Sequence, residues 1–354
     1  MRVGLLSMQR VPNYGSFWQA YCLKKMIQDC GNCSVEFIDI KPGEVETRCD
    51  YKRSFSFSKI KRIPYYLFQR NKRAIFNSWQ QKVLGCTESR NYGSDYDSIV
   101  IGSDEVFNFV QDSPWGFTTQ LYGDIDNPNV NSYAASFGYT TYESICEKKR
   151  GEQIANGLCN MKHMSVRDQN SAEIIKKLVN KDPDVLLDPV VVGDLPEKLP
   201  DIKEQKYILV YSYDFRLSET SLIKEVRAFA KKKQLKIISA GFYQDWVDKN
   251  ILPTPLELLR FFKNAEYVVT DTFHGTIFSA RMHKKFVSII RKTNEQKLGD
   301  LLTRIGMDSR RYSVGDSIAE KIEAEIDSAK FEQLRAKERM KSNSFLEACL
   351  GREQ

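Results

Sequence analysis

Tyr267-Val-Val-Thr-Asp-Thr-Phe-His-Gly-Thr-Ile-Phe278 is the stretch of sequence that decides the fold. A short run of β-branched residues, followed by polar residues and a glycine, predicts a strand, a loop at its carboxyl end and the start of a helix. In open α/β sheets, ligands bind outside the carboxyl ends of the strands. The backbone N–H groups of a helix start attract anions, and a histidine beside them is able to carry a proton to or from a bound phosphate or enol ether. We therefore favour a functional role for His274 over a purely structural one as a capping or hydrogen-bonded histidine.

Strand-like and helix-like segments alternate along the whole chain, which predicts parallel α/β sheets. Residues 188–205 interrupt the alternation with prolines and charges that show no apolar periodicity, and this composition indicates a linker. A chain of 354 residues is long enough for two domains. We expect Rossmann-like domains at 1–195 and 196–316, followed by a C-terminal helical extension at 317–354 that packs back on the first domain.

Composition limits the class of protein. No stretch approaches the ~18 apolar residues of a membrane span, so we expect a cytoplasmic protein. The eight scattered cysteines then favour reduced thiols, and we interpret Cys30-x-x-Cys33 as a coincidence because no second pair completes a zinc site. The net charge of +7 is spread along the chain, which argues against nucleic-acid binding and leaves anionic small molecules or acidic membrane surfaces as partners.

Four predicted loops at strand ends combine glycine with Ser, Thr, Asn or Asp. This arrangement lets backbone N–H groups approach an anion, although the same residues dominate ordinary turns and helix caps. The loops are 13–16, 102–105, 136–138 and the one that contains His274. Together they predict several loops that converge on one cleft.

Two further features have both a functional and a structural interpretation. Arg167 follows the last strand of the first half, where its planar fork would suit a carboxylate or phosphate; a surface ion pair with Asp168 or a neighbour is equally weighted. Residues 59–73 mix basic and aromatic side chains. For this stretch we favour a helix whose aromatic side chains pack inward. The alternative is peripheral contact with the inner face of an anionic membrane.

With these motifs in place, the chain resembles the polysaccharide pyruvyl transferase family over nearly its whole length. The order and spacing of the motifs, rather than any one of them, carry the resemblance. They are Asn13-Tyr-Gly15, Val100-Ile-Gly-Ser-Asp-Glu-Val-Phe-Asn108, Ala134-Ala-Ser-Phe-Gly138, Ser165-Val-Arg-Asp168, Leu187-Asp-Pro189 and Thr270-Asp-Thr-Phe-His-Gly-Thr276.

The resemblance implies two Rossmann-like domains facing a cleft, as in GT-B glycosyltransferases. It implies transfer of a pyruvyl group from phosphoenolpyruvate to a hexose of a cell-surface polysaccharide (exopolysaccharide or capsule) or of its lipid-linked precursor, giving a pyruvate ketal without a metal or other cofactor. The expected catalytic residues are His274, Arg167 and Asp104, with Asp104 as base on the acceptor hydroxyl. The expected donor-binding residues are Arg167, Thr272, Phe273, His274, Gly275 and Thr276, with phosphate oxygens at the helix start of Gly275-Thr276. The expected acceptor-binding residues are Asn13, Tyr14, Gly15, Ser103 and Asp104.

One departure from the family pattern matters for the donor. Some relatives have Arg-Leu-His where this chain has Thr272-Phe273-His274, so a hydroxyl replaces a cation. Either Arg281 or a residue of the other domain supplies the missing positive charge, or the donor is a different one. A GT-B glycosyltransferase that uses a nucleotide sugar and a non-catalytic anion-binding protein are the rival functions. The sequence leaves the acceptor sugar, the ketal stereochemistry and the oligomeric state open.

Overall fold

The computed structural model of the protein describes residues 1–44, 63–111, 113–291, 294–313 and 315–352. The chain divides into two compact units. The first takes the described parts of Met1–Phe57 and Ala336–Gln354 together with Asn77–Asp194, and the second takes the described part of Ser58–Phe76 together with Leu195–Arg335. The main division therefore falls between Asp194 and Leu195, but each unit also takes a segment that the expected domains assigned elsewhere.

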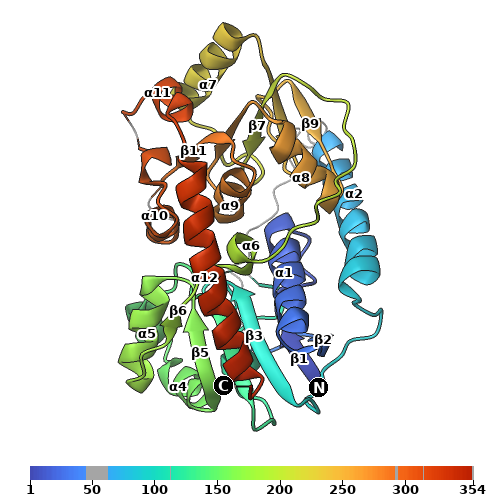
Figure 1. Ribbon diagram of the computed structural model, residues 1–354, viewed down its shortest axis with the longest axis vertical. Helices are drawn as coiled ribbons and strands as arrows, with labels where there is room; N and C mark the ends of the chain where they lie inside the picture. The colour runs from blue at the N-terminus through green and yellow to red at the C-terminus, as the bar shows by residue number, and fades with distance from the viewer. Residues whose placement is uncertain (45–62, 112, 292–293, 314, 353–354) are drawn as a thin grey trace, which may run out of the picture. The chain divides into compact units, whose positions relative to one another are not determined.

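The first unit is built on a six-stranded parallel sheet in the order β2-β1-β3-β4-β5-β6 (Figure 1). Its strands are β1 (Arg2–Leu6), β2 (Ser34–Ile38), β3 (Ser98–Asp104), β4 (Val130–Ala135), β5 (Met161–Val166) and β6 (Asp184–Val185). Every residue of β3 and β4 is buried, as is usual for central parallel strands with both faces covered. The carboxyl ends of these two strands position the polar residues described below.

The helices of the first unit follow the expected alternation, with one break. They are α1 (Tyr14–Gly31), α3 (Tyr142–Glu147), α4 (Gly151–Cys159), α5 (Gln169–Val179) and the short α6 (Pro189–Val192), together with a π-helical turn at Gln80–Leu84 and a 3-10 turn at Thr119–Tyr122. Helices α3 and α4 are separate rather than continuous, because Lys149 between them has a φ of 54°, which a continuing α-helix cannot accommodate. The expected linker at 188–205 begins with α6.

The second unit repeats the architecture with a six-stranded parallel sheet in the order β12-β11-β10-β7-β8-β9. Its strands are β7 (Tyr207–Tyr211), β8 (Lys236–Ala240), β9 (Lys249–Ile251), β10 (Tyr267–Thr270), β11 (Lys285–Ile289) and β12 (Arg311–Tyr312). Its helices are α7 (Thr220–Lys233), α8 (Pro255–Asn264), α9 (Phe273–Arg281), α10 (Glu295–Arg304) and α11 (Ile318–Glu323), with a 3-10 turn at Asp308–Arg310. In both units the sheet is a Rossmann-like parallel one.

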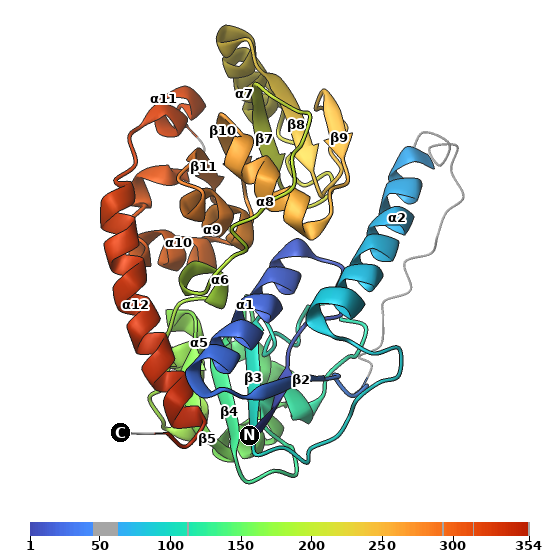
Figure 2. The ribbon, with the colours of Figure 1, turned by 45° about the vertical axis from the view of Figure 1, so that its right-hand side comes forward.

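The helical extension expected at the C-terminus is present as α11 and the long α12 (Ser328–Cys349). The end of α12 packs back on the first sheet (Figure 2). Phe345 lies against Tyr133 of β4 with ring centroids 6.2 Å apart, and the Ser98 hydroxyl donates to the Cys349 carbonyl at 3.0 Å. This part of the expected fold is confirmed.

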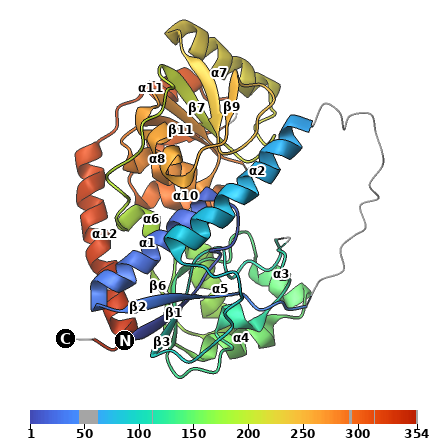
Figure 3. The ribbon, with the colours of Figure 1, turned by 90° about the vertical axis from the view of Figure 1, so that its right-hand side faces the viewer.

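Helix α2 (Ile63–Trp79) contains most of the basic and aromatic stretch at 59–73, of which residues 59–62 lie outside the described residues. Figure 3 shows its first turns beside the second sheet. Tyr65 and Phe68 pack inward against Tyr243, both with ring centroids 5.8 Å away. The side chains that α2 leaves exposed include Ile63, Tyr66, Leu67, Arg70 and Arg73. Across the described ranges, no helix combines the length and the apolar character needed to cross a membrane.

Candidate functional site

His274 lies in the first turn of α9, directly after the carboxyl end of β10. The helix begins at Phe273, two residues earlier than the expected start at Gly275. Thr272 is its N-cap, and the Thr272 hydroxyl accepts a hydrogen bond from the Gly275 N–H at 3.0 Å. The histidine is therefore fixed on a helix rather than carried by a loop.

The N–H groups that were expected to bind phosphate are used inside the protein. The Gly275 N–H donates to Thr272, and the Thr276 N–H donates to the Thr272 carbonyl at 3.1 Å. The Thr276 hydroxyl is also engaged, because it donates to the same carbonyl and lies 2.7 Å from the Ser288 hydroxyl. The phosphate contact at Gly275-Thr276 stays a prediction; in the structure these groups cap α9 and hold it on the sheet.

Gly275 is required by packing. A Cβ atom at this position would lie 2.2 Å from the Thr270 hydroxyl oxygen and 2.7 Å from Cδ1 of Tyr211, closer than such atoms approach. The glycine thus lets the helix start sit directly on β7 and β10. His274 itself is 9% exposed, with its ring 5.4 Å from that of Phe273 in an edge-on arrangement and 6.2 Å from that of Phe278. These rings restrict how the imidazole can turn.

Two arginines that the sequence analysis did not single out lie at the same edge of the second sheet. Arg291 follows β11 and forms an ion pair with Asp271, whose side chain is fully buried. Its Nη1 donates to the Arg216 carbonyl at 3.4 Å. Burial, with repulsion from the Arg216 guanidinium, lowers the pKa of Arg291 to about 10. Arg216 and Arg291 thus lie near each other, with the carboxylates of Asp271 and Glu219 close to Arg291.

Arg281 was one candidate for the positive charge that is missing at Thr272. Arg281 is the last residue of α9, whereas Thr272 caps its first turn. Nine residues of helix correspond to roughly 13 Å along the axis, so Arg281 lies at the far end from His274. Arg291 is paired with the residue next to Thr272 and is the better candidate. Its position one residue beyond the apolar run 286–290 was the signal available in the sequence.

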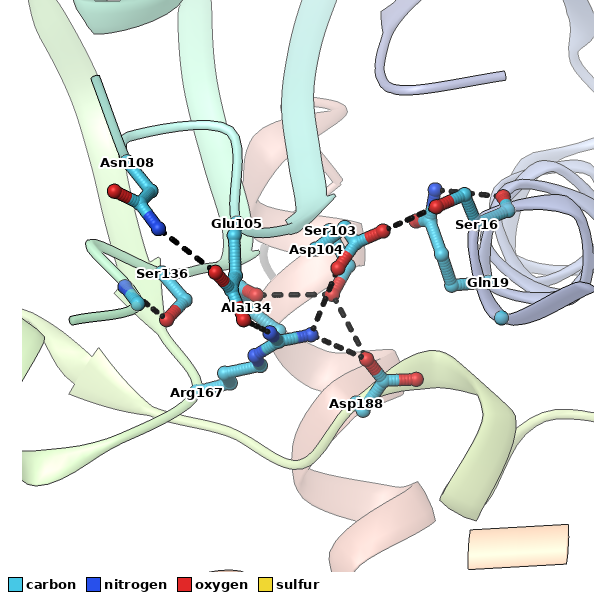
Figure 4. Close-up of polar contacts among 12 residues, drawn as sticks. Ser16, Gln19, Ser103, Asp104, Glu105, Asn108, Ala134, Ser136, Arg167 and Asp188 are labelled. Atoms are coloured by element: carbon cyan, nitrogen blue, oxygen red, sulfur yellow. Dashed lines mark hydrogen bonds and ion pairs between the residues drawn. The ribbon is translucent and has the colours of Figure 1, made fainter. Parts of the chain in front are cut away.

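In the first unit, Arg167 lies at the centre of a buried group of carboxylates (Figure 4). Its guanidinium is 3.1 Å from Asp188, 3.4 Å from Asp104 and 3.6 Å from Glu105, and its side chain is 1% exposed. Burial alone would lower the pKa of Arg167, but the charges of Asp104, Asp188 and Glu105 outweigh burial and raise it. The expected surface ion pair is therefore wrong, because the pair is buried. Asp168 instead caps α5, where it accepts from the Ser171 N–H at 2.8 Å.

This group of carboxylates carries more negative than positive charge, which opposes the approach of an anionic donor. That Arg167 binds the donor stays a prediction; the contacts in the structure fit better with a residue that positions Asp104. Asp104 ends β3 with a φ of 72°. Its carboxylate accepts from the Ser16 hydroxyl at 2.7 Å, and its side chain is 12% exposed.

Most of the other predicted acceptor residues make contacts that hold the fold together. The side chain of Asn13 caps α1 by accepting from the Gly15 N–H at 2.8 Å, and Tyr14 is fully buried. The Ser103 hydroxyl donates to the Ala134 carbonyl at 2.9 Å and is also fully buried. Asn13 is part-exposed and Asp104 retains a small exposed fraction, so these two remain the best acceptor candidates of the set.

The structure thus brings the predicted residues together in two groups, one in each compact unit. Asp104, Ser103 and Arg167 meet in the first unit, and the residues from Thr272 to Thr276 meet in the second. Within the described ranges, no three His, Cys, Asp or Glu side chains are arranged to hold a metal ion. Burial raises the pKa of the Cys30 thiol to about 11, which opposes the thiolate that a zinc ligand or redox cysteine needs.

Two Rossmann-like units in one chain define a GT-B-like α/β protein. The solved structure of LpCGTa in complex with UDP shares this fold, with a TM-score of 0.50 and 12% identity over 99% of this chain and 98% of that one. UDP-GlcNAc 2-epimerase from Neisseria meningitidis, bound to UDP-GlcNAc, is similar with a TM-score of 0.49 and 9% identity over 99% and 97% of the two chains. A putative UDP-N-acetylglucosamine 2-epimerase from Listeria monocytogenes has a TM-score of 0.49 and 8% identity over 96% and 90%.

Sequence comparison identifies the family. A search of curated proteins finds no match. The model of the polysaccharide pyruvyl transferase family matches residues 13–293, a range that contains every candidate residue from Asn13 to Arg291. The chain belongs to the polysaccharide pyruvyl transferase family and is a transferase.

Proposed function

We propose that the protein transfers a pyruvyl group from phosphoenolpyruvate to a hexose of a cell-surface polysaccharide or of its lipid-linked precursor, and that the product is a pyruvate ketal. The observation that carries the proposal is the family match across residues 13–293. The chemistry of the two groups of residues supports it.

The reaction needs one proton added to carbon and two protons removed from hydroxyls. Protonation of the methylene carbon of phosphoenolpyruvate places positive charge on the neighbouring carbon. A first sugar hydroxyl adds to that carbon and loses its proton, phosphate departs, and a second hydroxyl of the same hexose then closes the ketal. The second proton leaves with phosphate, so the atoms and charges balance.

His274 is proposed to handle the proton on the donor. Its imidazole is held in the first turn of α9 by Phe273 and Phe278. Histidine is the side chain best suited to proton transfer near neutral pH, and a positioned general acid–base group contributes about 10²- to 10⁴-fold in rate. Phe273 is proposed to shape the donor site, and Thr272 to act through the cap that fixes His274.

Arg291 and Arg216 are proposed to bind the carboxylate and phosphate of the donor. Their guanidinium groups lie close enough to act on each other, and a planar guanidinium binds either anion with paired hydrogen bonds. Because arginine supplies this charge, we propose that neither a metal ion nor another cofactor takes part.

Asp104 is proposed as the base for the acceptor hydroxyl, with Arg167 as its positioning residue. The contact to Ser16 at 2.7 Å and the ion pair to Arg167 at 3.4 Å fix both carboxylate oxygens. Asn13 is proposed to lie near the acceptor.

The test follows phosphate release from phosphoenolpyruvate with and without a panel of hexose glycosides, in the presence of EDTA. Wild type is expected to release phosphate only with an acceptor, and His274→Ala to lose at least about 10²-fold in kcat. His274→Gln separates proton transfer from packing because it retains a hydrogen-bonding side chain. Turnover of a nucleotide sugar without phosphate release from phosphoenolpyruvate would instead support the rival glycosyltransferase function.

Peripheral contact with an anionic membrane at its inner, cytoplasmic face is proposed through α2. Ile63, Tyr66 and Leu67 are 51%, 53% and 46% exposed, and the exposed Arg70 and Arg73 lie on the same helix. Apolar and basic side chains on one exposed stretch suit the headgroup region. Flotation with anionic but not with neutral vesicles is the expected result, and absence of flotation with both would remove the proposal.

A further inference from the structure

An open pocket with a cavity volume of about 160 Å³ lies in the first unit at the carboxyl ends of β1 and β2. The residues that line it come from the β1–α1 connection, from the chain after β2 and from the approaches to β3 and the 3-10 turn; the ones used below are Ser7, Gln9, Arg10, Asp39, Arg90 and Trp115. None of them belongs to the predicted sites or to the roles proposed above.

One wall of the pocket is flat and apolar. Trp115 is only partly buried, and it packs against the core of the first unit. Tyr92, which is 40% exposed, and Pro114 lie along the same pocket. A partly exposed indole that packs against the core gives a ligand an apolar surface to contact.

The pocket also contains a charged group, the carboxylate of Asp39, which hydrogen bonds hold in place. Asp39 accepts from Arg10 Nη2 at 2.9 Å, from Arg90 at 3.2 Å and from the Asn91 N–H at 2.9 Å. Burial raises the pKa of Asp39, but the hydrogen bonds from Arg10, Asn91 and Arg90 outweigh burial and hold the pKa below its ordinary value. The carboxylate is therefore ionised at neutral pH. The Arg90 side chain is 54% exposed, so it has donors left for a ligand.

Gln9 adds an unsatisfied acceptor. Its side-chain amide donates to the Ile38 carbonyl at 2.9 Å, while its buried oxygen accepts no hydrogen bond from any described residue. Buried polar groups are normally paired, and one beside a pocket indicates a missing donor. A ligand hydroxyl is such a donor.

A chain of hydrogen bonds joins the pocket to the proposed base. The Gln19 side chain donates to the hydroxyl of Ser7, which lines the pocket, and to the carbonyl of Ser16, whose hydroxyl binds Asp104 (Figure 4). The pocket and Asp104 thus belong to one continuous polar arrangement in the first unit.

We infer that this pocket binds the pyranose ring of the acceptor glycan. A pyranose has an apolar C–H face that matches Trp115 and a rim of hydroxyls that match Asp39, Arg90 and Gln9. Phosphoenolpyruvate fits less well, because it is small and multiply charged and because both arginines already face Asp39. The inference rests on the proposed function, since it assigns the sugar that receives the pyruvyl group.

The kinetic test uses p-nitrophenyl glycosides of a set of hexoses as acceptors at fixed phosphoenolpyruvate. Trp115→Ala is expected to raise the acceptor KM about tenfold, because the stacking surface is lost, while the KM for phosphoenolpyruvate stays unchanged. Trp115→Phe is expected to recover most of the affinity. Tyr142→Ala, in α3 of the same unit and outside the pocket, is the matched control. An unchanged acceptor KM in Trp115→Ala and Arg90→Gln would overturn the inference.

A binding measurement separates this inference from the proposed function. Saturation-transfer NMR of the same glycosides, without phosphoenolpyruvate, is expected to give a signal with wild type that Trp115→Ala removes and Tyr142→Ala retains. That result without any pyruvyl transfer would support the sugar pocket and count against the reaction. Absence of saturation transfer from every glycoside with wild type would overturn the pocket assignment.

Discussion

Charge around single residues distinguishes the two groups of the candidate site. Arg167 lies among three carboxylates, whereas Arg291 and Arg216 lie together with Asp271 and Glu219. The first group has the larger excess of negative charge, so the second is the better candidate for an anionic donor. Donor binding in the second unit and acceptor binding in the first stay predictions.

Loss of the Arg291 charge tests this division. Arg291→Gln combined with Asp271→Asn avoids leaving a buried carboxylate without its ion-pair partner. We expect this double variant to raise the KM for phosphoenolpyruvate by about tenfold or more with little change in the acceptor KM, because a charge-assisted contact is worth about 1.5–3 kcal/mol. Arg227→Gln in α7 is the control for loss of an arginine. Equal donor affinity in the double variant and wild type would contradict the assignment.

The sequence predicted the position of His274 between a strand and a helix start, because that pattern is local, and the function of His274 stays a prediction. It did not predict that Arg167 is buried. The partners of Arg167 are 21, 62 and 63 residues away in sequence, and only the fold brings them together. The sequence also did not predict that the N–H groups of Gly275 and Thr276 are hydrogen-bonded. The helix begins two residues earlier than expected, and Thr272 therefore becomes the acceptor for both groups.

Among the elements, α2 was the least predictable. Tyr65 and Phe68 pack inward against the second unit, as the favoured interpretation required of the aromatic residues, whereas Tyr66 is 53% exposed. The same helix buries a lysine: Lys72 donates to the Gly241 carbonyl at 2.8 Å, and its Nζ lies 4.0 Å from the centre of the Phe242 ring. Burial lowers the pKa of Lys72 to about 8, with Asp214 opposing the shift.

This lysine makes stability depend on pH. Between about pH 8 and pH 10.5, the unfolded chain holds a proton on Lys72 that the folded protein lacks, so the free energy of unfolding rises with pH across this window. The contribution is about 3 kcal/mol over the full window. We expect Lys72→Met to remove this rise in denaturant unfolding measured between about pH 7.5 and pH 10.5. The exposed Lys224→Met is the control, and parallel curves for Lys72→Met and wild type would show that the lysine is not buried as described.

Over the whole molecule, alternating strands and helices were enough to predict two parallel α/β units and the division near residue 195. They could not predict that residues 63–76 belong with the second unit. That assignment depends on contacts between residues far apart in sequence, for example Lys72 with Gly241. Short edge strands such as β6 and β12, with two residues each, were missed because they carry no periodicity.

The central claim is that a pyruvyl group moves from phosphoenolpyruvate to a sugar. The most direct measurement incubates the full-length protein with phosphoenolpyruvate and a hexose glycoside in D₂O, followed by mass spectrometry of the glycoside. We expect a glycoside that has gained one pyruvyl ketal with one deuterium in its methyl group, since a deuteron from the solvent is added to the methylene carbon. An acceptor that gains a phosphoryl group or a sugar instead, or a ketal without deuterium, would contradict it.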